Sequence, residues 1–155
     1  METGHHLLIV IADGEHARLV RQAKDNALHT QTVLESATAG ARSAELGTDH
    51  PGATFHTGAT AHHAIEPRHD LHTAAKEKFA REVAKEIKTS MDEAEDLRLL
   101  LVAPSHTLSS LQDALDPVAK QRVVGTLSKD LVKVPDHQLQ PHLRQWVPPI
   151  HRTIL

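Results

Sequence analysis

One segment of the chain gathers side chains that could bind a metal ion. It holds three imidazoles and two carboxylates: His62, His63, Glu66, His69 and Asp70. Such groups suit zinc, nickel or iron. Residues 63–66 begin an inverted zincin motif, but Pro67 stands where that motif needs a second histidine. We therefore favour a loop in which Glu66 pairs with Arg68 and Pro67 fixes the turn, and we predict no metal and no other cofactor.

Carboxylates near the ends of apolar runs could serve a nuclease. A two-metal nuclease needs several carboxylates that project from strands toward one point. No acidic residue lies within the apolar runs 7–12 and 97–103. We expect Asp13 to form a turn and Asp130 to cap an element or pair with Lys129. These three residues remain candidates for binding rather than for catalysis.

Hydroxyl and thiol nucleophiles are also poorly supported. Cysteine is absent, which removes thiolate nucleophiles, thiolate metal sites and disulfides. Ser105 and His106 are adjacent in the chain but lack the Gly-x-Ser-x-Gly elbow, so we expect Ser105 to cap a helix. Neither a Gly-x-Gly-x-x-Gly motif nor a Walker lysine is present, so the usual phosphate cradle of nucleotide-binding proteins is missing. We predict no catalytic residue.

The basic residues give a hint of a nucleic-acid partner. Lys and Arg total 17 and Asp and Glu total 20, so the formal net charge is −3 with neutral histidines. That charge excludes a uniformly basic nucleic-acid binder but not a local basic patch. If the long loop folds over the second strand, four arginines could converge on a phosphate: Arg18, Arg21, Arg42 and Arg68. The alternative is that these arginines are ordinary solvated charges.

Length and composition limit the class of protein. A chain of 155 residues fits one domain, and a hydrophobic content of 39% supports a modest core. The three aromatic residues are too few for an aromatic base-stacking platform. The 14 histidines could carry much positive charge below pH 6, but we expect solvated surface groups without a sensing role. The first apolar run is too short for a signal peptide or a membrane span, so we expect a cytoplasmic protein.

The pattern of apolar residues predicts the elements that would position these groups. A helix is clearest over 73–91, where Ala75, Phe79, Val83, Ile87 and Met91 recur at every fourth residue. A long Gly- and His-rich stretch without apolar period, 36–72, precedes it. We predict strands over 7–12, 16–22, 28–34 and 97–103, and a fifth strand over 122–127 that is interrupted at 128–130 and resumes over 131–134. Further helices are predicted over 105–115 and 138–146.

This order predicts an α/β fold. Three strands in an antiparallel meander are followed by α-β-α-β-α, which gives a mixed sheet with helices packed on it. We expect one domain over residues 1–146, with 36–72 as its long loop. Residues 147–155 would form a C-terminal tail, and its apolar character suggests self-association as a homo-oligomer.

Several segments resemble a known bacterial family. The runs Asp49–Phe55 and His62–Arg68, a helix that contains Phe79, and the stretches 99–104 and 123–131 are similar to the family called "protein required for attachment to host cells". That family is in turn similar to the middle domain of archaeal and eukaryotic peptide-release factors. The resemblance therefore implies a ribonuclease-H-like or ribosomal-protein-like fold.

The sequence departs from release factors at their functional loop. The resemblance implies that a Gly-Gly-Gln tripeptide, which positions water for ester hydrolysis, would lie between residues 54 and 68. This chain has Gly58-Ala59-Thr60-Ala61 there and no Gly-Gly-Gln at all. Peptide release is therefore not expected, and only the scaffold carries over.

These observations lead to one functional hypothesis and one alternative. We expect a non-catalytic binding protein that contacts RNA, tRNA or the ribosome through the 54–68 loop, with no membrane partner. Its recognition surface would consist of Gly58, His62, His63, Glu66, Pro67 and Arg68. The alternative is a hydrolase, metal-assisted or not, that acts on an RNA-linked or ester substrate with Glu66 or a histidine as base.

Overall fold

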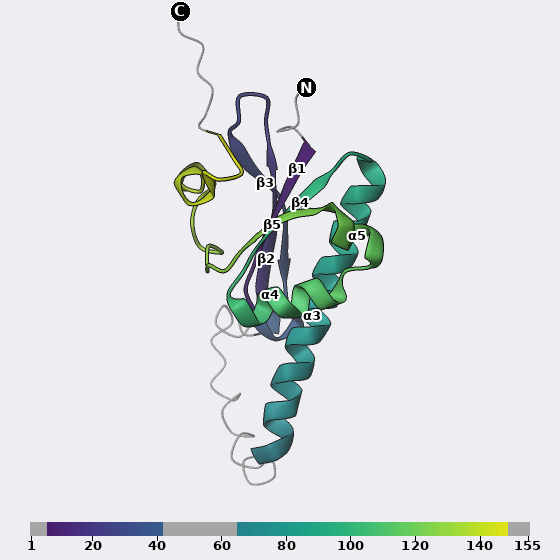
Figure 1. Cartoon of the computed structure of the whole chain (residues 1–155). Helices are drawn as coiled ribbons and strands as arrows, with labels where there is room; N and C mark the ends of the chain where they lie inside the picture. Colours follow the sequence, from purple (N-terminus) through teal and green to yellow (C-terminus); the bar gives the residue numbers. More distant parts are fainter. Residues whose placement is uncertain (1–5, 42–64, 149–155) are drawn as a thin grey trace, which may run out of the picture.

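A five-stranded mixed sheet forms the centre of the molecule. The computed structural model describes residues 6–41 and 65–148, and for residues 65–70 and 72 it describes the backbone alone. The strand order is β3-β2-β1-β4-β5, with antiparallel pairing in β3-β2-β1 and parallel pairing in β1-β4-β5 (Figure 1). The predicted α/β class, with an antiparallel meander followed by βαβ connections, is confirmed. The strands are β1 (Leu7–Ala12), β2 (His16–Gln22), β3 (Leu28–Glu35), β4 (Arg98–Val102) and β5 (Val123–Leu127).

Two tight turns connect the strands of the meander. In the first turn, Asp13 Oδ1 accepts hydrogen bonds from the amides of Glu15 at 2.8 Å and His16 at 2.7 Å. The predicted turn role of Asp13 is therefore confirmed. In the second turn, Asn26 adopts a φ of 72°, a left-handed conformation that asparagine tolerates better than most residues. β1 lies between β2 and β4, and both faces of the sheet are covered at this strand, so all six of its residues are buried.

Helices cover one face of the sheet. Phe79, Val83 and Ile87 of α3 are buried against the strands, as the four-residue periodicity predicts, whereas Ala75, the first residue of that pattern, is exposed. Alternate residues of β1 and β4 meet them, among them Leu8 and Leu101. This face has an entirely aliphatic and aromatic core. The helices are α3 (Ile65–Glu93), α4 (Ser105–Ala114) and α5 (Pro117–Arg122).

A segment without long helices covers the opposite face. We call residues 131–148 the C-terminal segment; in Figure 1 it lies across the sheet from the helices. Its short 3-10 helices are η4 (Asp136–Gln138) and η5 (Gln140–Leu143). It contributes four buried side chains to a second core against β1, β2 and β4: Leu131, Leu139, Leu143 and Val147.

The predicted long loop over 36–72 is wrong at both ends. Residues 37–41 are helical, and α3 begins at Ile65 rather than at residue 73. Pro67 does not prevent this start, because proline is tolerated in the first turn of a helix, where its missing N–H has no partner to lose. Residues 42–64 of the predicted loop lie outside the described residues.

The second half of the chain also departs from prediction at several points. Residues 131–134 form a turn instead of a strand, and the helix predicted over 138–146 is replaced by η4 and η5. Pro135 and Pro141 explain the broken geometry, because each lacks an N–H and fits only the first turn of a helix. Val147, assigned by sequence to the tail, is fully buried.

Two helices begin in different ways. Asp116 caps α5 by accepting a hydrogen bond from the amide of Ala119 at 2.8 Å. Pro104, not Ser105, precedes α4, and no side chain caps that helix. The Ser105 hydroxyl instead shares a hydrogen bond of 2.7 Å with the hydroxyl of Ser128. Among the described helices, none is long and apolar enough to cross a membrane.

Candidate functional site

Three of the predicted binding residues lie at one edge of the sheet. Asp13 follows β1, and Lys129 and Asp130 follow β5, which is parallel to β1 and separated from it by β4 alone. Two strand spacings place these connections about 10 Å apart. Lys129 and Asp130 are exposed, whereas both hydrogen bonds described for Asp13 serve its own turn. The carboxyl edge of the parallel strands therefore presents Lys129 and Asp130 to solvent.

Helix α3 extends beyond this same edge (Figure 1). Its described side chains before Phe79, at residues 71 and 73–78, are all exposed. Lys76 lies on the same side of the helix as the buried residues, but beyond the end of the sheet. Its aliphatic chain packs over Gly14. A Cβ atom added to Gly14 would lie only 3.2 Å from Lys76 Cε. A side chain at residue 14 would therefore contact the flexible chain of Lys76 and shift it slightly.

Four cations form a row along the exposed face of α3. We call this set the cation row, and all four of its side chains are exposed: Lys78, Arg81, Lys85 and Lys88. At about 100° per residue they fall within a sector of about 80°, diametrically opposite the buried Phe79, Val83 and Ile87. The row is about 15 Å long, since ten residues separate its ends.

Acidic residues border the cation row. Glu82 and Glu86 lie on one side of the row, and Glu77 lies on the other, according to their helical positions. Pairs such as Glu77 and Arg81, spaced four residues apart, attract each other weakly on a helix surface. The row is therefore a narrow band of positive charge rather than a broad basic patch.

Arg18 is not available to a phosphate. Its guanidinium donates to Asp136 Oδ1 at 2.9 Å, to the carbonyl of Leu131 at 2.9 Å, and to the carbonyl of Val134. The side chain is 12% exposed. Neither predicted role of Arg18, phosphate contact or solvated charge, is correct. Arg18 instead attaches the C-terminal segment to β2.

The carboxylate of Asp136 completes this attachment. It accepts hydrogen bonds from the amide of Thr30 at 2.7 Å and from the Thr30 hydroxyl at 2.5 Å. Partial burial raises the pKa of Asp136, but the hydrogen bonds from Thr30 and the charges of Arg18 and His29 outweigh that effect and hold it below its usual value. Burial lowers the pKa of Arg18, which the charge of Asp136 opposes. Arginine nevertheless stays charged at any physiological pH.

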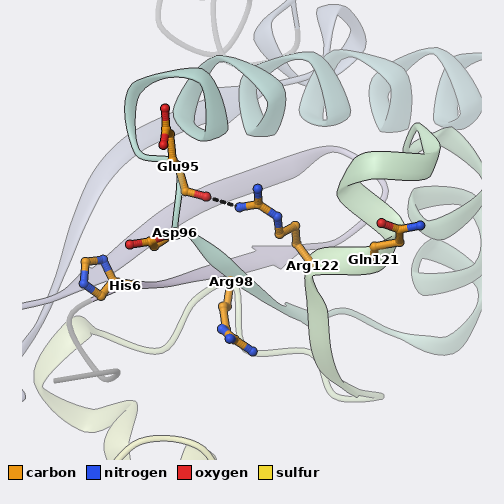
Figure 2. Close-up of a pocket in the computed structure, with 6 residues that line it drawn as sticks. All are labelled: His6, Glu95, Asp96, Arg98, Gln121 and Arg122. Atoms are coloured by element: carbon orange, nitrogen blue, oxygen red, sulfur yellow. Dashed lines mark hydrogen bonds between the residues drawn. The ribbon is translucent and has the colours of Figure 1, made fainter. Parts of the chain in front are cut away.

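A cavity of about 400 Å³ lies at the opposite edge of the sheet, where β1 and β4 begin. It is lined by His6, Glu95, Asp96, Arg98, Gln121 and Arg122. Figure 2 shows that the guanidinium groups of Arg98 and Arg122 point to opposite sides and that the Glu95 carboxylate points away from both. Arg122 donates to the backbone carbonyls of Glu95 and, at 3.2 Å, of Leu97. The polar groups do not converge, and Arg122 serves to fix the turn between α3 and β4.

Comparisons with known proteins agree with this fold. A family model described as "Protein required for attachment to host cells" matches residues 8–143. The chain belongs to this host-attachment family. No curated protein matches it.

The host-attachment fold also occurs in a solved structure from translation. A crystal structure of an archaeal translation termination factor matches with a TM-score of 0.51 and 12% sequence identity, over 90% of this chain. This chain corresponds to 38% of the length of that factor. The expected likeness to a release factor is thus confirmed as a likeness of fold.

The remaining predicted site residues lie at or before the start of α3. Gly58, His62 and His63 are outside the described residues, as is Arg42. Glu66, Pro67 and Arg68 are in the first turns of α3, where the structure describes the backbone alone. Within the described part of the chain, no group of three or more His, Asp or Glu side chains could hold a metal ion.

Sequence reasoning missed the cation row. The signal was present, because Lys78, Arg81, Lys85 and Lys88 recur at intervals of three, four and three residues. That is the same helical periodicity that identified the buried side of the helix. The apolar residues alone were used to predict the helix, so the basic residues on its other side were not predicted to form one surface.

Proposed function

We propose that this host-attachment protein is a non-catalytic binding protein that contacts RNA through the cation row of α3. The observation that carries the proposal is the placement of four exposed cations on one side of a helix whose other side is anchored in the core. Phosphate groups are the polyanions that such a row of lysine and arginine attracts. The net charge of −3 means that this attraction is local and does not come from the whole molecule.

A partner in the translation machinery is favoured by the fold. One structural match is a translation termination factor, and α3 is the element that extends furthest from the sheet (Figure 1). Residues 54–68 lead directly into α3 in the sequence, so the predicted surface around His62, His63 and Arg68 is adjacent to the helix in the chain. We therefore propose ribosomal RNA or tRNA as the partner, with these residues as a second point of contact and the cytoplasm as the location.

A binding role without catalysis is supported by what the described carboxylates do. Asp13 holds a turn, Asp116 caps α5, and Asp136 attaches the C-terminal segment. Each of these groups is engaged by backbone or side-chain donors of the protein itself. These three carboxylates act in folding, which supports a binding role rather than catalysis for them.

The test is to neutralise the cation row and measure RNA binding. The row variant carries Lys78→Gln, Arg81→Gln, Lys85→Gln and Lys88→Gln. The matched control removes three lysines and one arginine from scattered exposed positions: Lys24→Gln, Arg98→Gln, Lys120→Gln and Lys133→Gln. Both variants change the net charge equally, so only the arrangement of the lost charges differs.

Binding to purified ribosomes and to total tRNA would be measured by co-sedimentation and by fluorescence anisotropy. We expect the row variant to bind at least 10-fold more weakly than the wild type, while the control variant changes by less than about 3-fold. The proposal is wrong if the two variants lose affinity equally, because binding would then depend on net charge alone. It is also wrong if the wild type binds neither probe.

A further inference from the structure

We infer that the cation row recognises the sugar–phosphate backbone of double-helical RNA, rather than the bases of a single strand. The inference rests on the proposed function and specifies its ligand. It follows from the rigidity of the row, from its narrow shape and from the side chains that surround it.

The row is rigid because α3 is fixed along its buried side. Phe79, Val83 and Ile87 are nearly or fully buried in the helix-covered core, and they alternate along the helix with members of the row. The backbone positions of the four cations are thus held at axial intervals of about 4.5 to 6 Å within one sector of about 80°. A stiff double helix offers phosphates in fixed positions, whereas a flexible single strand would have to lose conformational freedom to match the row.

The narrow shape of the row also favours a single line of phosphates. Glu77 borders the row on one side, and Glu82 and Glu86 border it on the other. Like charges would repel phosphates displaced to either side of the line. The favourable ligand is therefore one phosphate backbone lying along the helix, as the edge of a double-helical groove would present it.

Among the described side chains of α3, no phenylalanine, tyrosine or tryptophan is exposed for unpaired bases to stack on. Proteins that bind single strands stack the bases on aromatic side chains. Phe79 is the aromatic residue of α3, and it is buried. The exposed large hydrophobic side chains of the described residues are all aliphatic: Val33, Leu71, Val118 and Val124. Recognition of double-stranded RNA instead relies on shape and on contacts with phosphates and 2′-hydroxyl groups.

The experiment compares three labelled probes with the full-length protein. They are a 20-base-pair RNA duplex, one of its strands alone with a sequence that does not self-pair, and a DNA duplex of the same sequence. Anisotropy titrations from 50 to 200 mM salt would be made with the wild type, the row variant and the matched control variant. About four phosphate contacts predict a roughly 100-fold loss of affinity over that salt range.

We expect the RNA duplex to bind most tightly of the three probes, about 10-fold more tightly than the single strand. The row variant should lose most of this affinity, and the slope of log Kd against log salt should fall by about 3. Single-strand RNA binding that equals or exceeds RNA-duplex binding, and still depends on the row, would overturn this inference and leave the proposed function intact. Row-dependent binding of the DNA duplex that equals or exceeds binding of the RNA duplex would also overturn this inference. Absence of row-dependent binding to every probe would overturn both.

Discussion

The two faces of the sheet are covered in different ways. On one face, α3, α4 and α5 pack an apolar core whose members recur with helical periodicity. On the other, the C-terminal segment has only two short 3-10 helices and is attached by specific contacts, notably that between Arg18 and Asp136. The first face depends on a repeated pattern of apolar side chains, so its stability is distributed. The second combines the four buried side chains of the segment with a few polar contacts between individual residues, so part of its stability is concentrated at those contacts.

The largest loss of stability should come from the helix-covered core. Ile87→Ala removes a fully buried side chain between α3 and the sheet and should reduce the free energy of unfolding by about 2 to 5 kcal/mol. The exposed substitution Glu82→Ala on the same helix should change it by less than about 0.5 kcal/mol. Urea unfolding followed by circular dichroism measures both. Equal losses in the two variants would show that the buried side of α3 is not the main support of this face.

A smaller loss is expected where Trp146 of the C-terminal segment packs on β5. A Cβ atom at Gly125 would lie 2.7 Å from Cε2 of Trp146, so a larger residue there must push the indole away. Gly125→Val should cost about 1 to 3 kcal/mol, in the range of overpacked cores. In a Trp146→Ala background the same substitution should cost almost nothing, since valine suits a strand. Equal costs in the two backgrounds would show that the close packing on Gly125 is not the cause.

The contact between β3 and the C-terminal segment should give a comparable or slightly smaller loss. Asp136→Asn keeps the shape of the side chain but weakens three charge-assisted hydrogen bonds, from Arg18 and from Thr30. We expect a loss of about 1 to 2 kcal/mol at pH 7. Asp130→Asn, at an exposed position, is the control and should have little effect. Native-state hydrogen exchange should show the amides of the C-terminal segment exchanging faster in Asp136→Asn, while those of α3 remain protected.

The pH dependence of this contact follows from the lowered pKa of Asp136. A carboxyl group whose pKa is lower in the folded state stabilises the protein above its unfolded value of about 3.9, and this contribution is lost as pH falls through the folded pKa. The difference in stability between the wild type and Asp136→Asn should therefore be constant above about pH 5 and should shrink below pH 4. A difference that grows on acidification would contradict this assignment of charge.

The same contrast explains how far the sequence allowed prediction. The meander, the helix-covered core and most strand limits follow from apolar periodicity, because many residues contribute to each signal. Arg18 and Asp136 are separated by 118 positions, and no local pattern links them. The short 3-10 helices and turns of the C-terminal segment, which its prolines interrupt, likewise have no apolar periodicity from which they could be predicted. In the candidate site, the turn role of Asp13 was predictable from its neighbours in the sequence. The cation row could have been predicted only by applying the helical periodicity to the basic residues of α3 as well as to its apolar residues.

The smallest effect on stability should come from the cation row itself. Neutralising it removes attractions within α3, such as that of Glu77 for Arg81, but also removes repulsions, such as that of Arg81 for Lys85 four residues later. Each term is about 0.2 to 0.5 kcal/mol and the two kinds oppose each other, so the row variant should unfold within about 1 kcal/mol of the wild type. Thermal unfolding of the row variant and the matched control variant, monitored by circular dichroism, measures this. A large loss in the row variant alone would mean that these cations support the fold, and weakened RNA binding could not then be attributed to a lost contact surface.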